Sequence, residues 1–260
     1  MSIKQVLVLI SVILLFYGFL IEPNLIFVKK ITLKSNDIKN LKIVFISDFH
    51  FSKFAYARLK RIVNIVNKQN ADVIISGGDY VMAHNAAISM NMKYMASEIS
   101  KMKSKYGIYS VLGNHDYYKD EKYVKSNLKK YGIKILENNN YKLIHEGKPL
   151  FIAGISDMQT TFYNLGKALN KTYPPIILVS HSPDIIPLAE NRVNLILSGH
   201  THGGQVRIPF YGAVIVPSKY GKTYESGFIN NIAYITKGLG TSILHLRFNC
   251  PPEITIIEYI

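Results

Sequence analysis

The sequence predicts an α/β fold whose second half is rich in strands. Short β-rich segments alternate with helical segments as far as residue 131, and this alternation is typical of packed α/β layers. After residue 131, strand patterns follow one another with few helical signals, which favours a second sheet packed on the first. No internal repeat and no Gly/Ser/Pro-rich tract divides the chain, so we expect a single main domain.

Composition is consistent with one large folded domain. The chain has 260 residues, of which 48% are hydrophobic and 18% are charged, and this balance excludes a disordered protein. The net charge of +14 indicates an anionic partner such as phospholipid headgroups, nucleic acid or a phosphorylated substrate, although a general lysine bias explains part of it. Cys250 is the only cysteine, so no intrachain disulfide can form.

An uncharged apolar segment, residues 6–21, precedes the domain. As a helix it would be about 24 Å long, a little short of a hydrocarbon core of about 30 Å, and Lys4 and the Lys29–Lys30 pair could snorkel to cover the difference. The absence of an A-x-A-like cleavage site after Leu20 favours an uncleaved anchor over a secretory signal or a core helix. We therefore expect an anchor at 1–28, a basic linker at 29–41 and the domain at 42–260.

Lysines are unevenly distributed around this anchor. Five follow the apolar segment, at positions 29, 30, 34, 39 and 42, whereas only Lys4 precedes it. The positive-inside rule then places the domain in the cytoplasm, on a single-pass anchor in the cell membrane. The same lysines would face an anionic membrane surface.

The first half of the domain shows strands alternating with helices. Leu59, Ile62, Val63 and Val66, for example, have the spacing of one helix face. On such patterns we expect strands at Ile43–Ser47, Asp72–Ser76 and Gly107–Leu112, and helices at Tyr56–Val66, Asn85–Met102 and Lys119–Tyr131.

The second half reads mainly as strands. Apolar and β-branched runs bounded by turn residues recur to the carboxyl terminus. The expected strands are Ile133–Leu136, Lys142–His145, Leu150–Ser156, Pro175–Ser180, Leu195–Ser198, Ile232–Thr236, Leu244–Phe248 and Ile254–Glu258.

Polar side chains follow five of these strands directly. Because carboxyl ends of strands in open α/β sheets border a common crevice, we expect these side chains to converge. They are Asp48, His50, Asp79, Asn114, His115, His181, His200 and His202. Around the last two, in SGHTHGGQ (198–205), the glycines free the backbone so that both imidazoles can approach one locus. His84, His145 and His245 lack a strand-end motif, and we expect them to be ordinary surface or core histidines.

With His115 set aside, these residues form a metal-ligand set. Two carboxylates, one amide oxygen and four imidazoles without a thiolate suit Mn, Fe, Zn or Co. Seven ligands exceed one tetrahedral site and match two ions about 3.5–4 Å apart that share a carboxylate, an arrangement that activates water for attack on a phosphate ester. Taken singly, Asp48 and Asp79 could instead cap helices, His50 could be a satisfied polar residue, and His181 could belong to a turn.

The motifs together resemble one known family. D-x-H (48–50), GGD (77–79), GNHD (113–116), the lone His181 and GHTH (199–202) match the calcineurin-like metallophosphoesterases in order and spacing over residues 41–210. The GHTHGGQ form, GLGTS, RFNCPPEI (247–254) and the anchor are similar to a membrane-associated bacterial subgroup. Some relatives in that subgroup act on lipid phosphodiesters or on the pyrophosphate of UDP-2,3-diacylglucosamine.

The resemblance implies a four-layer fold: a two-sheet β-sandwich flanked by helices and preceded here by one transmembrane helix. It also implies roles for the strand-end residues. Asp48, His50, Asp79 and His202 would hold one divalent ion, and Asn114, His181 and His200 would join the bridging Asp79 on a second. His115 would assist the leaving group or stabilise the phosphoryl charge without being a ligand, and Asp116 would orient its ring.

We therefore expect a two-metal hydrolase of phosphoester or pyrophosphate bonds on a membrane lipid or lipid-linked substrate, without a nucleic-acid partner. A nuclease or cyclic-nucleotide phosphodiesterase using the same site is the nearest alternative. A non-catalytic, metal-stabilised membrane scaffold is the alternative from another class. The oligomeric state stays open. Candidate substrate contacts in the loops are Arg207, Lys219, Tyr220, Lys222 and Tyr224.

Overall fold

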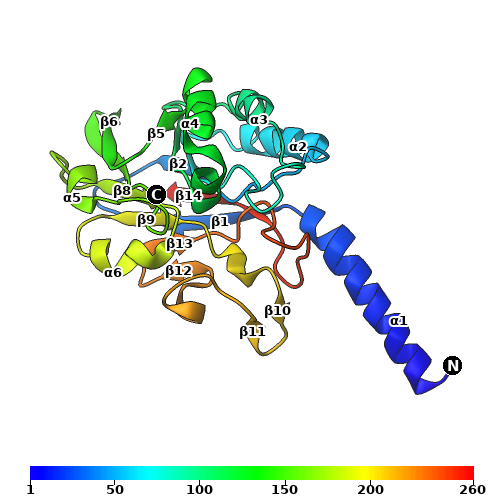
Figure 1. Ribbon diagram of the computed structural model, residues 1–260. Coiled ribbons are helices and arrows are strands. Elements are labelled where there is room, and N and C mark those ends of the chain that lie inside the picture. Colours follow the sequence, from blue (N-terminus) through cyan, green and yellow to red (C-terminus); the bar gives the residue numbers. More distant parts are fainter.

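Two six-stranded sheets pack face to face, with helices on both outer faces and one helix projecting away from the domain (Figure 1). This computed structural model describes all 260 residues. The helices are α1 (Ile3–Phe16), α2 (Tyr56–Asn67), α3 (Met92–Ile99), α4 (Asn114–Lys130), α5 (Leu165–Ala168) and α6 (Ile186–Ala189). The strands are β1 (Phe27–Leu33), β2 (Leu41–Ile46), β3 (Val73–Ser76), β4 (Ile108–Ser110), β5 (Lys134–Ile135), β6 (Asn139–His145), β7 (Lys148–Gly154), β8 (Ile176–Ser180), β9 (Leu195–Ser198), β10 (Arg207–Ile208), β11 (Gly212–Ala213), β12 (Gly227–Ile229), β13 (Ala233–Ile235) and β14 (Glu253–Tyr259).

The first sheet has the strand order β1–β14–β2–β3–β4–β5. All its neighbours are parallel except β14 and β2. Its inner strands are buried on both faces, which explains their continuous apolar sequences. In β2, Ile43 and Phe45 face the second sheet, whereas Val44 and Ile46 face the helices.

The second sheet has the order β12–β13–β9–β8–β7–β6. Its four central strands are parallel, and the edge strands β12 and β6 pair antiparallel. The expected two-sheet α/β sandwich flanked by helices is thus confirmed.

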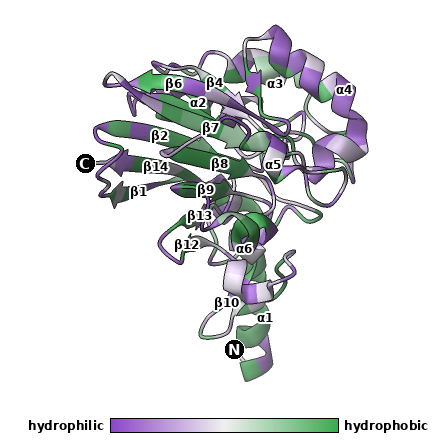
Figure 2. Ribbon diagram, turned by 90° about the vertical axis from the view of Figure 1, so that its left-hand side faces the viewer, coloured by the Kyte–Doolittle hydropathy of each residue, from purple (hydrophilic) through white to green (hydrophobic).

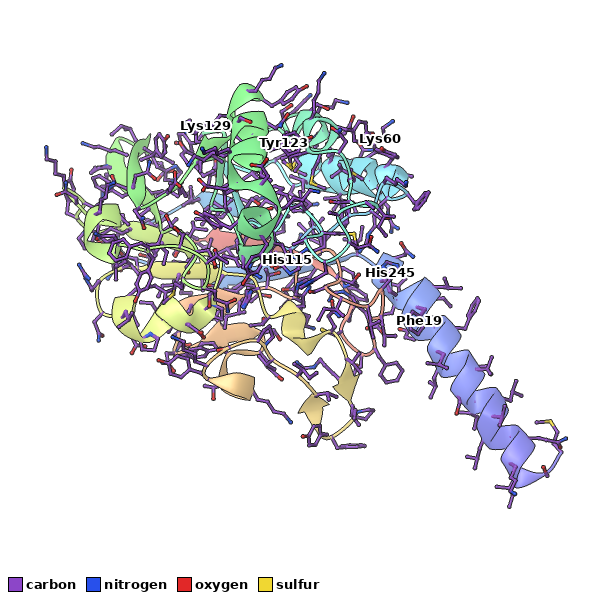
Figure 3. The ribbon with its side chains drawn as sticks, viewed as in Figure 1. Phe19, Lys60, His115, Tyr123, Lys129 and His245 are labelled. Carbon is purple, nitrogen blue, oxygen red and sulfur yellow. The ribbon has the colours of Figure 1, made fainter.

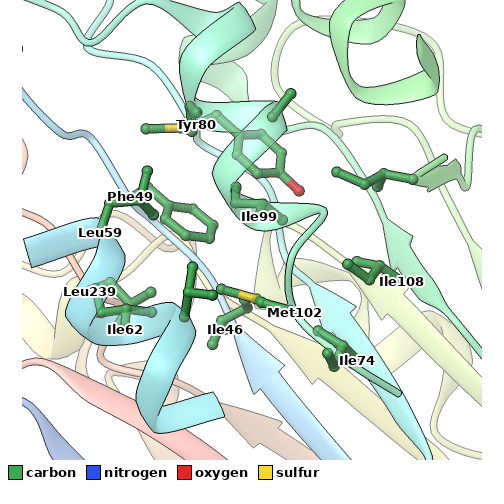
Figure 4. Packing of buried hydrophobic residues seen from close by; sticks show 14 of the residues in the cluster. Ile46, Phe49, Leu59, Ile62, Ile74, Tyr80, Ile99, Met102, Ile108 and Leu239 are labelled. Atoms are coloured by element: carbon green, nitrogen blue, oxygen red, sulfur yellow. The ribbon is translucent and has the colours of Figure 1, made fainter. Parts of the chain in front are cut away.

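Three hydrophobic clusters separate the layers. The largest fills the space between the first sheet and α2, α3 and α4, where Ile46 and Ile74 meet Leu59, Ile62 and Ile99 (Figure 4). A second lies between the two sheets, and a third lies between the second sheet and the short helices α5 and α6. Because both faces of each sheet are covered, polar groups gather at the strand ends.

Two helices differ from their expected bounds. The helix expected from Asn85 begins only at Met92, because the Asn91 side chain caps the helix by accepting a hydrogen bond from Tyr94 N. The helix expected from Lys119 begins already at Asn114, where Asp116 accepts from Gly113 N in the first turn. The strand-end motif GNHD is therefore itself a helix start.

Two segments of the sheets also differ from expectation. The segment 29–41, expected as a linker, begins within β1, an edge strand that pairs with β14 over its full length. Its exposed lysines hid the strand pattern. The strand expected at Leu244–Phe248 is wrong. This segment is a loop, because the buried Arg247 side chain occupies the carbonyls of Lys237, Gly240 and Cys250.

Helix α1 is the one element whose side chains do not pack into the domain. None of its residues is buried, and the ribbon is mainly hydrophobic apart from a hydrophilic turn near the N-terminus (Figure 2). A π-helical turn (Tyr17–Ile21) and a 3₁₀ turn (Glu22–Asn24) continue it to the domain. Together Ile3–Asn24 is long and apolar enough to cross a membrane.

Candidate metal centre

The strand ends bring the expected ligands into two adjoining clusters. Asp48, His50 and His202 form one, and Asp79, His181 and His200 form the other. All six side chains are buried. In each cluster the potential ligand atoms lie within 4.8 Å of one another. His200 and His202, two positions apart in sequence, therefore belong to different clusters.

The backbone at these positions is unusual. Asp48, His50, Asp79, His200 and His202 all have positive φ, between 41° and 71°. This left-handed region is sparsely populated by non-glycine residues and costs on the order of 1–3 kcal/mol each. Such conformations concentrate at functional sites, since selection for folding alone would remove them.

Glycines give the clusters room. A Cβ at Gly199 would collide with Ser47 and with the Asp48 carboxylate, and one at Gly113 would collide with Asp79 and His181. Gly203 and Gly204 have left-handed backbones, as a flexible turn after the histidines requires. The glycines of GHTHGGQ thus serve two different purposes, space and backbone conformation.

Asp79 lies between the two clusters. Its Oδ2 atom is 3.2 Å from His50 Nε2 and 3.2 Å from His181 Nε2. The opposite ring nitrogens face backbone carbonyls: His50 Nδ1 is 3.0 Å from Val81 O, and His181 Nδ1 is 2.7 Å from Gly77 O. Since carbonyls only accept, both Nδ1 atoms carry protons, and each ring turns its Nε2 atom toward the carboxylate. Positive charge satisfies these facing atoms, either as a proton on Nε2 of a charged ring or as a metal ion that faces the Nε2 lone pairs of neutral rings.

Further acceptors converge on the second cluster. His181 Nε2 is also 3.1 Å from Asn114 Oδ1 and 3.2 Å from His200 Nδ1. In the first cluster, Asp48 Oδ2 and His202 Nδ1 are buried without a hydrogen-bond partner. Unpaired buried acceptors are costly in a folded protein unless an ion binds them. The donor set, oxygen and imidazole nitrogen, fits divalent transition-metal ions.

The electrostatics of the cluster also favour a cation. Burial opposes ionisation of Asp79, yet His181 and His50 hold its pKa well below the usual range. Burial likewise opposes charge on His181, but Asp79 and Asp48 raise its pKa to about 10. Burial lowers the pKa of His200 to about 4 and holds the pKa of His202 well below its usual range. Positive charge is therefore held beside Asp79, and the outer imidazoles are neutral and available as ligands.

His115 lies against the first cluster with its backbone fixed by Asp79. Its N–H donates to Asp79 Oδ1 at 2.8 Å, and its ring packs edge-on against His50 with centroids 4.5 Å apart. The ring Nδ1 accepts from Ala83 N at 3.2 Å, which leaves the proton of the neutral ring on Nε2. Burial lowers the pKa of His115 to about 4.

The expectation that Asp116 orients the His115 ring is wrong. The Asp116 carboxylate instead accepts hydrogen bonds from the backbone N–H groups of Asp79, Tyr80 and Gly113, at 2.8–3.0 Å. It is fully buried and holds the loop after β3 against the start of α4. Asp116 therefore fixes the backbone that carries Asp79. The hydrogen bond to His115 Nδ1, which was expected to involve Asp116, is made by Ala83 N–H instead.

Sequence reasoning missed two residues at this site. Gln159 places its side-chain amide 2.8 Å from His200 Nε2, the ring nitrogen that faces away from the cluster. It follows β7, a sixth strand end, so the strand-end signal was present in the sequence but lacked a family motif. His84, expected to be an ordinary histidine, packs its exposed ring edge-on against His115 with centroids 4.8 Å apart.

The other two histidines are structural. His145 lies between the Tyr106 hydroxyl and the Lys39 carbonyl, and His245 contacts the Thr241 hydroxyl near the base of α1 (Figure 3).

Most of the candidate substrate contacts are occupied within the chain. Arg207 forms an ion pair with Glu225 at 2.7 Å. Lys222 lies over the Tyr211 ring, and its ammonium donates to the Tyr211 carbonyl. Tyr220 and Tyr224 pack against each other with ring centroids 4.7 Å apart. The loop 207–225 is therefore internally braced.

Comparison with known proteins assigns the family. Residues 41–204 match the model of the calcineurin-like phosphoesterase family. The chain is 32% identical to the Bacillus subtilis (strain 168) metallophosphoesterase YkuE, over 92% of this chain and 87% of that protein. It is 29% identical to the Escherichia coli (strain K12) phosphodiesterase YaeI, over 84% and 82%. A Danio rerio transmembrane protein with metallophosphoesterase domain is 30% identical, over 85% of this chain and 53% of its own length.

The residues that match the family model include those that the structure brings together as potential metal ligands. The matched region contains all of the clustered Asp and His side chains, and these suit a binuclear site for divalent metal ions. A catalytically silent scaffold does not fit relatives that are named as phosphodiesterases and metallophosphoesterases. The chain belongs to the calcineurin-like phosphoesterase family and is a metal-dependent phosphoesterase.

Proposed function

We propose that this chain hydrolyses a phosphodiester or pyrophosphate bond of a membrane lipid or lipid-linked substrate, using two divalent ions held by the strand-end residues. Asp48, His50 and His202 hold one ion, Asn114, His181 and His200 hold the other, and Asp79 is shared. When bound, the two ions supply Lewis-acid activation of water and of the phosphoryl oxygens.

The observation that carries the two-ion assignment is the position of Asp79 Oδ2. It lies at equal distances from the Nε2 atom of one imidazole of each cluster, and because the Nδ1 atoms of both rings face backbone carbonyls, Nε2 is the atom that each ring would offer to an ion. A carboxylate shared between two ions offsets the repulsion between them. One ion alone would leave the acceptors of the other cluster unsatisfied.

His115 is the residue we assign to the leaving group. Because Ala83 N–H occupies its Nδ1, the neutral ring presents Nε2–H as a hydrogen-bond donor that can stabilise the negative charge developing on the oxygen that leaves phosphorus. The hydrogen bond from its backbone to Asp79 keeps the ring at the edge of the cluster without making it a ligand. His84 packs against the same ring from the solvent side and restricts its rotation.

The chain itself supports a lipid-linked substrate. Helix α1 is exposed and is apolar from Val6 to Phe16 apart from Ser11, and the exposed Lys29 and Lys30 of β1 follow its base in the chain. Such lysines attract anionic headgroups by about 1 kcal/mol each. A relative named as a transmembrane protein and another named as a phosphodiesterase are consistent with this substrate class. By contrast, Arg207, the arginine of the 207–225 loop, is already paired with Glu225 and is not free for a nucleic-acid backbone.

We propose a cytoplasmic position for the domain because the lysines are concentrated after the anchor. A reporter fused after Ile260 should be active only in the cytoplasm. Activity confined to the outer side would contradict this orientation.

Substrate class is tested with the full-length protein in detergent and Mn²⁺. The panel contains phospholipids, nucleotide-sugar lipids, bis-p-nitrophenyl phosphate, cyclic nucleotides and single-stranded DNA, with Asp79→Asn as the inactive control. We expect a lipid-linked phosphate to give the highest kcat/KM. A higher value for DNA or a cyclic nucleotide would overturn the lipid assignment, and no turnover of any substrate would overturn the catalytic one.

A further inference from the structure

We propose that the catalytic domain itself enters the bilayer surface through a ring of exposed apolar side chains around the base of α1. This apolar collar consists of Phe210, Tyr211 and Ile215 from the β10–β11 region and Ile243 and Leu244 from the loop before β14. The inference rests on the proposed crossing of the membrane by Ile3–Asn24 and does not depend on which substrate is cleaved.

The base of the anchor is docked on the domain. Gly18 is buried so closely against Leu246 and Arg247 that a Cβ there would collide with both. Arg247 N donates to Gly18 O at 2.9 Å, and the Tyr17 ring packs edge-on against Phe248. The last turns of the apolar helix therefore belong to the folded domain.

Glu22 fixes this junction. It is 1% exposed, and its carboxylate accepts hydrogen bonds from Asn249 N and Cys250 N. The Cys250 thiol in turn donates to His202 O at 3.3 Å. A continuous set of buried contacts therefore joins the anchor to the loop that carries a proposed metal ligand, and the helix cannot swing away from the site without breaking it.

The length of the exposed helix then determines how close the domain lies to the membrane. The exposed part, Ile3–Phe16, has 14 residues and is about 21 Å long, whereas the hydrocarbon core is about 30 Å thick. If the anchor is to span the hydrocarbon core, the docked turns after Phe16 must also lie within it. Tilting of the helix would increase the difference between helix length and core thickness. The outer surface of these turns and of the following strand is suited to lipid, since Leu20, Ile21, Leu25 and Phe27 are exposed there.

The collar lies beside these docked turns. Its loops are joined to Phe248 by hydrogen bonds, from Arg207 N to Phe248 O and from Phe248 N to Gln205 O, both at 2.9 Å. Figures 1 and 2 show the β10–β11 hairpin leaving the domain on the same side as α1. Phe210 is fully exposed and Ile243 is 81% exposed. Exposed apolar residues are ordinary singly, but a group of them around a membrane helix indicates an interaction surface.

The charge of the same segments fits an anionic leaflet. Residues 208–224 and 236–252 contain no Asp or Glu, while Lys219, Lys222 and Lys237 lie among them; Arg207 is paired with Glu225 and adds no free charge. Aromatic side chains such as Tyr211 favour the headgroup level. With the collar in the interface, the metal centre is held at a fixed height beside the headgroup phosphates.

The absence of tryptophan from the sequence gives a direct test. Full-length Phe210→Trp is reconstituted into vesicles of phosphatidylcholine and phosphatidylglycerol, with or without brominated acyl chains near the interface. We expect the fluorescence of Trp at 210 to be quenched roughly twofold or more by brominated lipid and to resist aqueous acrylamide, because collar side chains reach the headgroup–acyl boundary. Tyr123→Trp on α4, far from α1 in Figure 3, is the matched control and should show the opposite pattern.

The outcomes separate the two proposals. Protein that fails to float with the vesicles overturns the membrane span on which the inference rests. Protein that floats while Trp at 210 behaves like Trp at 123 overturns the collar alone. Phe210→Ser should retain the turnover of bis-p-nitrophenyl phosphate in detergent, which confirms folding. Loss of that turnover would mean that Phe210 supports the site rather than a membrane surface.

Discussion

The metal centre and the apolar collar are built in opposite ways. At the metal centre, acidic and imidazole side chains are buried, several without partners, on strained backbone. At the collar, large apolar side chains are exposed on loops that are braced by ordinary hydrogen bonds. Each region is unfavourable for a free soluble domain, and we propose that each is stabilised by a partner, cations at the metal centre and lipid at the collar.

The loop before β14 takes part in both regions. Arg247, fully buried, binds the carbonyls of Lys237, Gly240 and Cys250. Gly240 N in turn donates to Asp48 O, so the loop touches the metal cluster at one end and α1 at the other. The loop before β14 therefore contacts both the metal centre and the anchor. It can do so because hydrogen bonds to the Arg247 side chain, and not the pairing of a β-strand, determine its backbone conformation.

The largest expected effect comes from breaking the shared carboxylate of the metal centre. Asp79→Ala should abolish binding of both ions and lower turnover by roughly 10³-fold or more, since it removes several kcal/mol of transition-state stabilisation. Metal content measured by mass spectrometry checks this. Two ions retained per chain would show that Asp79 is not shared.

His115→Ala should separate chemistry from metal binding. We expect two ions to remain and turnover to fall by roughly 10²–10³-fold, the range for removal of a hydrogen-bond donor that stabilises transition-state charge. Metal loss in this variant would make His115 a ligand, as its proximity to His50 and Asp79 also allows. Unchanged turnover would remove it from the mechanism.

The buried parts of the metal centre were largely predictable from sequence. Strands such as Ile43–Ser47 are apolar on both faces, and their ends carry the ligands, so periodicity located both. The positive φ of Asp48 and His200 was not predictable, because it depends on contacts from other strands. Gln159 was missed because one polar residue after a strand carries no pattern of its own, and Asp116 was misassigned because its partners are backbone groups set by the tertiary structure.

The collar was much less predictable. Residues 244–248 were expected as a strand, because exposed apolar side chains on a loop, such as Leu244, have the same composition as buried ones. Similarly, β1 read as a linker, because its lysines face outward from a sheet edge that the sequence does not reveal. Periodicity predicts burial in a protein core, and it fails where apolar side chains are exposed on a loop or where lysines face outward from a sheet edge.

Gln159→Ala should have a smaller effect, confined to one metal cluster. Without the amide beside His200 Nε2, the ring loses its orientation, and we expect metal affinity to fall about 10–100-fold, the range for partners of metal-binding histidines. The melting temperature of the metal-free protein should not change. The surface variant Gln69→Ala is the matched control, and equal metal affinities in the two variants would contradict a positioning role.

Glu22→Ala should produce the smallest effect, on stability alone. It leaves the buried N–H of Cys250 and the partly buried N–H of Asn249 without an acceptor, which costs about 1–3 kcal/mol in the free energy of unfolding. Glu258→Ala, which breaks an exposed ion pair with Lys42, should cost about 0–1 kcal/mol. Chemical denaturation in detergent measures both, and equal losses would mean that the anchor is not docked.

Electron paramagnetic resonance of the Mn²⁺-loaded protein tests the two-ion centre most directly. Two Mn²⁺ ions that share Asp79 should lie about 3.5–4 Å apart and give a spin-coupled spectrum at two equivalents per chain. Asn114→Ala should convert that spectrum toward that of an isolated ion. A spectrum of uncoupled ions in the unmodified protein, or saturation at one equivalent, would contradict the account.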